Sequence, residues 1–139
     1  MKYTRKEIER MPSGNELDRL IAAWLGWELR PDKRWGGCFF WFDTKTMRPS
    51  GWLERDVPND YNGDVFKPST DIAHAFLVWD RLVEMERYPT LHEGPCEYRG
   101  LVISNVAGVG LVNPNIDEIF AEEKAHAICL AALLTCVEV

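Results

Sequence analysis

Apolar residues recur at helical spacing in the first part of the chain. Between Ser13 and Gly26, leucine, isoleucine and tryptophan return every three or four positions, which predicts an amphipathic helix. Ser13 and Glu16 have the spacing of a capping box at a helix start. Gly26 suits the left-handed position that follows a helix, so we expect this helix to end near Leu25.

Two further helices are predicted later in the chain. The first runs from near Thr70 to before Pro89. The residues expected to face the core from it are Ile72, Ala75, Phe76, Trp79, Leu82 and Val83. The second covers 116–137 and is apolar on nearly every side from Ala127 to Leu134. A helix of this kind is buried on all sides or docks on a partner, so residues 125–137 predict a homo-oligomer contact.

Two β-hairpins are predicted between these helices. Residues 38–44 (CFFWFDT) and 50–57 form the first, with its turn around Pro49 and Gly51, because aromatic residues are enriched in strands. Residues 96–106 and 109–113 form the second. The segments interpreted as loops or turns are 30–37, 58–64 and 88–95. The order α-ββ-α-ββ-α predicts a single α+β domain over 1–139, in which three helices pack on an antiparallel sheet as a layered sandwich.

Composition narrows the function classes. The chain is 46% hydrophobic and 27% charged, which is typical of a globular protein. Its formal charge of −6 argues against DNA binding, because such binding draws on lysine and arginine. The amino-terminal residues carry alternating charges without an apolar stretch, and no apolar run is long enough for a membrane span. We therefore expect no membrane partner. The four cysteines form no C-x-x-C pair, so we expect reduced thiols in a cytoplasm.

The segment FKPSTDIAHAF at 66–76 brings hydrolase-type side chains together. Asp71 and His74 could serve a hydroxyl nucleophile in a small hydrolase. Three residues on one helix start make that geometry awkward, whereas a hydroxyl cap from Ser69 or Thr70 with Asp71 at the positive helix end explains them directly. His74 is then expected near Arg81 in solvent. Free N–H groups here, with Ser69 and Thr70, could also bind an anion.

Aromatic residues around the first hairpin supply a second candidate site. Phe39 and Trp41 lie on the strand face opposite to Phe40 and Phe42, so either both faces are covered or one binds a ligand. Exposed aromatic rings can stack on nucleobases, and neighbouring arginines can pair with phosphates. The predicted ligand-binding residues are Arg34, Trp35, Phe39, Trp41, Trp52, Ser69 and Thr70.

Metal and cofactor motifs are not found. Asp60, Asn62 and Asp64 alternate as at the start of a calcium loop, but Val65 and Asp71 stand where glycine and glutamate are needed. The two glycines of AGVGLVN at 107–113 lack the third glycine of a dinucleotide fingerprint and are interpreted as a hairpin turn. We therefore predict no metal, no cofactor and no catalytic residue.

Three segments resemble one known family in order and spacing: ELDRLIAAWLGW, PSTDIAHAFLVWDRL and AHAICLAALL. They are similar to the phage ABA-sandwich domain family, over about Met11 to Val137. The resemblance implies a sheet layered between helices, a phage or prophage source, and a site of action in the cytoplasm of the bacterial host. It implies no catalytic residues.

Three functions remain open on these grounds. The first is a phage-encoded, non-enzymatic binding protein, for example an anti-defence protein that sequesters a nucleotide-like signalling molecule. The second is a protein-interaction or virion-assembly accessory. The third is the small hydrolase that uses Asp71 and His74.

Overall fold

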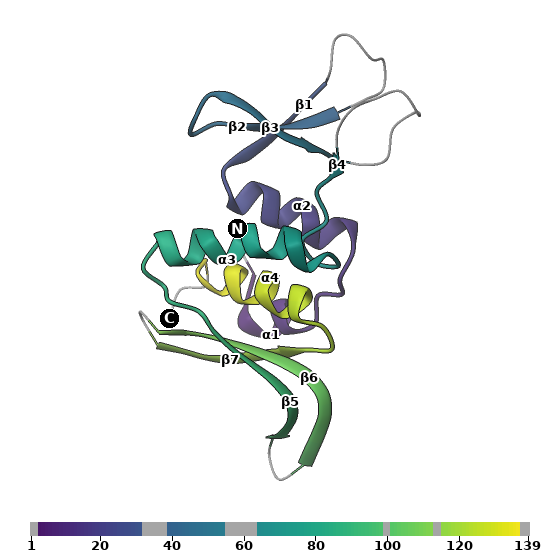
Figure 1. Cartoon of the computed structure of the whole chain (residues 1–139), viewed down its shortest axis with the longest axis vertical. Coiled ribbons are helices and arrows are strands. Elements are labelled where there is room, and N and C mark those ends of the chain that lie inside the picture. The colour runs from purple at the N-terminus through teal and green to yellow at the C-terminus, as the bar shows by residue number, and fades with distance from the viewer. Residues whose placement is uncertain (1–2, 32–38, 55–63, 99–100, 113–114, 137–139) are drawn as a thin grey trace.

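The computed structural model describes residues 3–31, 39–54, 64–98, 101–112 and 115–136. They form four helices and seven strands (Figure 1), which confirms the α+β class. The elements are α1 (Arg5–Glu9), α2 (Asn15–Trp24), β1 (Trp27–Pro31), β2 (Phe39–Asp43), β3 (Arg48–Leu53), β4 (Asp64–Val65), α3 (Ile72–Glu84), β5 (Thr90–Tyr98), β6 (Leu101–Val112), β7 (Asn115–Ala121) and α4 (Lys124–Leu134).

The strands form two separate sheets, and α2, α3 and α4 lie between them (Figure 1). We expected one sheet between helices, and the described residues instead place helices between a β1–β4 sheet and a β5–β7 sheet. The described residues form four helices rather than the three predicted, and the additional one is the short helix α1. Thr4 and Glu7 form a capping box at its start, and this box stabilises a helix too short to show apolar periodicity.

The first sheet has the order β1-β2-β3-β4, with antiparallel pairs except for the parallel β3–β4 pair. Strand β1 includes residues 30 and 31, which were predicted to lie in a loop. The β2–β3 turn lies at 44–47 rather than around Pro49 and Gly51, both of which lie within β3. Asp43 and Met47 explain the shift: the Asp43 carboxylate accepts the Lys45 backbone N–H at 2.9 Å, and Met47 adopts a positive φ of 57°.

Helix α2 ends as expected and begins one residue later than expected. Its carboxyl-terminal cap is Leu25, and Gly26 follows with φ 88°, which confirms the glycine prediction. At the other end the cap is Gly14, and no side chain caps the helix, so the Ser13 prediction is wrong. The Gly14 N–H donates instead to Ser69 Oγ at 2.9 Å, a contact 55 positions away that local sequence does not reveal.

The second sheet has the order β5-β6-β7 and is antiparallel throughout. Three predictions fail here: 90–95 belongs to strand β5 rather than to a loop, 96–106 contributes to two strands rather than one, and 115–121 is a strand rather than a helix. Gly108 and Gly110 lie inside β6 and not in a turn. Long-range pairing of the central strand β6 with both neighbours outweighs the local preferences that suggested otherwise.

Helix α4 is the centre of the core. Its buried residues are Ala125, Ala127, Ile128, Cys129, Leu130, Ala131, Ala132, Leu133 and Leu134. It contacts α1, α2 and α3 as well as β6 and β7. Its apolar surface is therefore covered within the chain, and this removes the reason for predicting a homo-oligomer contact through 125–137.

Helix α3 confirms part of the predicted core side. Ala75 and Leu82 are buried as predicted, together with Val78, and Trp79 packs against the core. The prediction is wrong for three residues, because Ile72 is 37% exposed, Phe76 49% and Val83 44%. Contact with α4 rather than the hydrophobicity of each residue thus selects the buried side.

No helix in the described part of the chain is long and apolar enough to cross a membrane.

Candidate functional site

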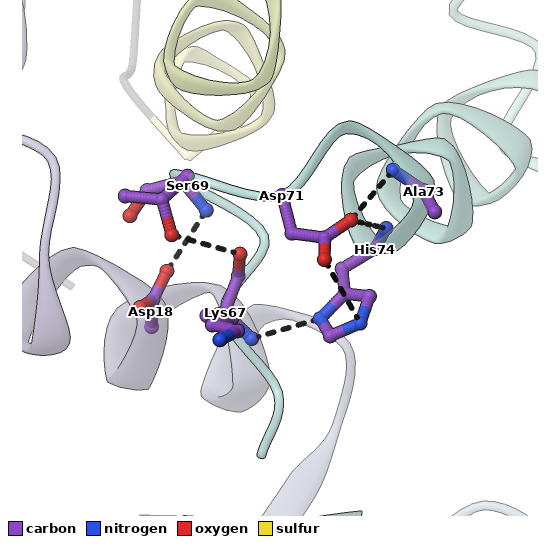
Figure 2. Close-up of polar contacts among 7 residues, drawn as sticks. Asp18, Lys67, Ser69, Asp71, Ala73 and His74 are labelled. Carbon is purple, nitrogen blue, oxygen red and sulfur yellow. Dashed lines mark hydrogen bonds and ion pairs between the residues drawn. The ribbon is translucent and has the colours of Figure 1, made fainter. Parts of the chain in front are cut away.

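Asp71 caps helix α3. Its Oδ1 accepts the backbone N–H groups of Ala73 at 2.9 Å and His74 at 3.4 Å, and its backbone is extended, as an amino-terminal cap requires (Figure 2). The prediction that Ser69 or Thr70 is the cap is therefore wrong. A helix start was correctly expected here, but three adjacent residues could each have supplied the capping oxygen.

Ser69 joins the α3 start to α2. The residue is 1% exposed, and its backbone N–H donates to Asp18 Oδ1 at 2.9 Å. Its hydroxyl accepts the Gly14 N–H at 2.9 Å and lies 3.4 Å from the Gly14 carbonyl oxygen. Because its polar groups are already paired within the protein, Ser69 has a structural role, and its predicted ligand contact stays a prediction.

Asp18 is a carboxylic acid in a buried setting, 8% exposed on helix α2. Burial raises the pKa of Asp18, because the charged form loses solvation, and the hydrogen bonds from Ser69 oppose the rise. The Asp18 carboxyl thus serves as an acceptor that holds the 67–71 segment in place.

His74 lies against the first sheet rather than in solvent beside Arg81. Its side chain is 12% exposed, and the ring meets Trp52 edge-on, with centroids 4.5 Å apart. The ring also stacks at 6.0 Å on Phe66. Nδ1 accepts the Lys67 backbone N–H at 3.1 Å, and Nε2 lies 3.6 Å from Asp71 Oδ2 (Figure 2). The covering sheet explains the burial, which helix periodicity alone could not indicate.

These contacts do not assemble a nucleophile with its base. The His74 ring nitrogens face Lys67 and Asp71, and no described hydroxyl donates to either of them. The Thr70 hydroxyl donates to the Lys67 carbonyl oxygen at 3.5 Å instead. Since hydroxyl activation needs a hydrogen bond between nucleophile and base, the arrangement offers the hydrolase hypothesis no pair to use.

A cleft of about 660 Å³ opens where the α1–α2 connection, the start of α3 and the β7–α4 junction meet. Its lining residues are Glu9, Arg10, Met11, Pro12, Ser13, Ser69, Thr70, Ala121, Glu122, Glu123 and His126. Two of them, Ser69 and Thr70, were predicted from the sequence as ligand residues. The others come from segments far apart in the chain, and no motif connects them, so local sequence carried no signal for this cleft.

The cleft contains charges of both signs. Glu122 and Glu123 are exposed, and within the described residues neither has a cationic partner. Arg10 likewise has no carboxylate partner in the described ranges, whereas Glu9 pairs with Arg5 at 2.8 Å. Excess carboxylate disfavours a polyphosphate, while one free guanidinium can hold a single phosphate or carboxylate group.

His126 forms one wall of the cleft and a structural contact. Its Nε2 lies 2.7 Å from the Met11 carbonyl oxygen, so it donates a hydrogen bond to the α1–α2 connection. This bond joins the start of α4 to the opposite wall. Two opposite walls of the cleft are therefore tied together by this hydrogen bond.

The predicted aromatic site is not assembled by the described residues. Trp41 is 6% exposed and belongs to the core. Trp52 is half-buried and packs on Phe66 at 5.5 Å, and Phe39 is half-buried in β2. Both faces of the strand are thus largely covered, the first of the two outcomes that the sequence left open. Arg34 and Trp35 lie outside the described residues.

Arg30 of β1, next to the predicted aromatic site, already has partners within the protein. The Arg30 guanidinium lies 3.7 Å above the Phe42 ring and 3.6 Å from the Glu28 carboxylate. This cation–π contact stabilises the edge of the first sheet. Among the predicted ligand residues that the structure describes, Thr70 alone is exposed in the lining of the cleft.

Comparisons with protein-family models, curated proteins and solved structures give no significant match to this chain. Membership of the phage ABA-sandwich family accordingly stays a prediction from the sequence.

Proposed function

We propose that this protein is a non-enzymatic binding protein that holds a small molecule in the cleft between Arg10, Thr70 and the β7–α4 junction. The cleft itself supports this proposal, because its volume of about 660 Å³ lies within the range of about 300–1,000 Å³ typical of ligand sites. The absence of a hydroxyl–imidazole pair among the described residues favours binding over hydrolysis.

The ligand class that fits both the cleft and the resemblance is a nucleotide-like molecule with few phosphates. Arg10 can pair with one phosphate, and the Thr70 hydroxyl adds a hydrogen bond. The carboxylates of Glu122 and Glu123 accept hydrogen bonds from the amino groups of a base. A phage protein acting in the host cytoplasm would sequester such a signalling molecule and so weaken host defence; the resemblance supports this role.

Calorimetry with nucleoside monophosphates and cyclic nucleotides tests the proposal. Arg10→Gln removes a charge-assisted contact and should weaken binding roughly 10- to 100-fold. Thr70→Val should weaken it about tenfold, because the shape is kept and one hydrogen bond is lost. Thr46→Val is the matched control, since Thr46 is exposed in the β2–β3 turn outside the cleft.

Native mass spectrometry of protein purified from its source cells gives an independent result. A retained small molecule that is lost in Arg10→Gln supports the proposal. Binding that is equal in all three variants, or no retained molecule and no nucleotide binding, contradicts it.

A second candidate, a protein-interaction or virion-assembly accessory, is favoured by the outer side of α3. Ile72 is 37% exposed, Phe76 49% and Val83 44%, so a row of apolar side chains faces solvent on one helix. Self-association, if it occurs, has this surface available rather than the buried α4. Light scattering at rising concentration tests it: Phe76→Ser should lower the measured mass, and a constant monomer mass contradicts self-association. Purified virions that contain the protein would support the assembly role.

A further inference from the structure

His74 connects three parts of the molecule. It belongs to α3, and its Nδ1 is bonded to the 66–71 connecting segment through Lys67 (Figure 2). Its ring packs on Trp52 of the first sheet. Phe66, next to Lys67, stacks on the same ring, and its own N–H donates to the Leu53 carbonyl oxygen at 3.0 Å. The ring therefore lies at the junction between α3 and the first sheet.

The hydrogen bond at Nδ1 requires a neutral ring. Because the Lys67 backbone N–H can only donate, Nδ1 must carry no proton, and the ring proton must reside on Nε2, toward Asp71. A proton added at Nδ1 would direct one N–H at another across 3.1 Å. Protonation of His74 and this hydrogen bond thus exclude each other.

His126 shows the opposite case in the same chain. Its Nε2 lies 2.7 Å from the Met11 carbonyl oxygen, which can only accept, so this nitrogen carries a proton. Protonation of the other ring nitrogen leaves the contact intact. The two histidines therefore differ in the role of the bonded ring nitrogen, which accepts in His74 and donates in His126, although both are half-buried.

Charges around His74 make its protonation attainable. Asp71 on α3 faces Nε2 at 3.6 Å, and Asp18 on α2 interacts with the ring through its charge. Both carboxylates attract an imidazolium. Lys67 contributes the opposing N–H, while Trp52 and Phe66 from the first sheet carry no charge. An imidazolium at this position keeps the attraction of both carboxylates and loses the hydrogen bond from Lys67.

We propose that His74 is a pH-sensitive joint: proton uptake at Nδ1 breaks its hydrogen bond to Lys67 and loosens the first sheet and its connecting segment from α3. The closed joint requires an unprotonated Nδ1 and is lost when this nitrogen takes up a proton, because only the open state accepts that proton without an N–H conflict. The joint does not require the proposed ligand, although the 66–71 segment that it holds includes Thr70 of the cleft.

NMR of the whole protein tests the joint directly. The ¹⁵N shifts of the His74 ring should report an unprotonated Nδ1 at pH 8, and the Lys67 amide should titrate together with the ring. After correction for intrinsic exchange, protection of the Lys67 amide should fall about fivefold or more on acidification, as expected for one lost hydrogen bond. The Ser69 amide, bonded to Asp18, separates the effect of that carboxyl from the effect of His74.

Two substitutions define the outcome. His74→Asn keeps an acceptor near the Nδ1 position without titration, so Lys67 protection should become independent of pH. His74→Phe keeps an aromatic ring without an acceptor, so protection should be low at every pH. His126→Asn is the control and should leave the wild-type titration unchanged. A protonated Nδ1 at pH 8, or the same pH dependence in wild type and His74→Asn, overturns the proposal.

Discussion

At the scale of single residues, the polar groups between Lys67 and His74 each have a distinct structural task. Asp71 supplies the helix cap, Ser69 joins the segment to α2, and His74 contacts the first sheet. Each task occupies the atoms that catalysis would need. A stretch whose composition matches a hydrolase site can therefore serve as a connection between layers, and only the hydrogen-bond partners distinguish the two.

Asp18 should make stability depend on pH in a defined direction. Burial raises the folded-state pKa of Asp18, so its stabilising contribution is complete below the unfolded pKa of about 3.9 and is lost as pH rises through the folded value. Asp18→Asn keeps an acceptor for the Ser69 N–H and does not ionise. Relative to wild type, this variant should therefore become more stable as pH rises from acid to neutral, as measured by urea unfolding. Asp80→Asn, at an exposed position on α3, is the control, and identical pH profiles of the two variants contradict the expectation.

At the scale of elements, α3 and α4 differ in how much of their apolar surface is buried. Helix α4 is covered on every side, by three helices and by strands β6 and β7. Helix α3 buries Ala75, Val78 and Leu82 and leaves Phe76 half exposed. Contact with α4 selects the buried residues of α3, so the hydrophobic pattern alone identified only part of its core side.

Substitutions in these two helices should differ strongly in effect. Leu130 on α4 is 1% exposed, and Leu130→Ala should lower the free energy of unfolding by about 2–5 kcal/mol, because apolar burial is lost and a cavity remains. Phe76→Ala should change it by about 0.5 kcal/mol or less, as is usual at surface positions. Urea unfolding of both variants gives the comparison. Equal losses would show that the outer side of α3 is covered in solution, for example by a second copy.

At the scale of the whole molecule, one core joins the helices to both sheets. The cluster around α4 extends from Val109 and Ile119 of the second sheet to Trp41 of the first. Its continuity predicts that the interior opens only when the fold as a whole opens.

Thiol labelling measures that opening. Cys136 is exposed and Cys129 is buried, and burial, followed by the nearby Asp18 charge, raises the pKa of the Cys129 thiol well above its usual value. Under native conditions Cys129 should react with iodoacetamide at least about 100-fold more slowly than Cys136, because reaction requires unfolding of α4. Mass spectrometry of the separate peptides measures both rates, and denaturant should bring them together. Similar native rates would contradict a single cooperative core.

The sequence by itself determined the α+β class, the existence of α2, α3 and α4, the first hairpin strands and the glycine that ends α2. These features follow from local periodicity and local capping chemistry, which a short stretch contains in full. The sequence also predicted Thr70 as a ligand residue at a helix start, and the structure places Thr70 in the lining of a cleft.

Tertiary structure alone decided the division into two sheets, the strand at 115–121, the buried side of α3 and the cleft between Arg10 and Glu123. Each depends on contacts between residues far apart in the chain, such as Gly14 with Ser69 and His126 with Met11. Pairing and packing over such distances outweigh local preference, because an element is stabilised mainly by the surface that it buries against its neighbours.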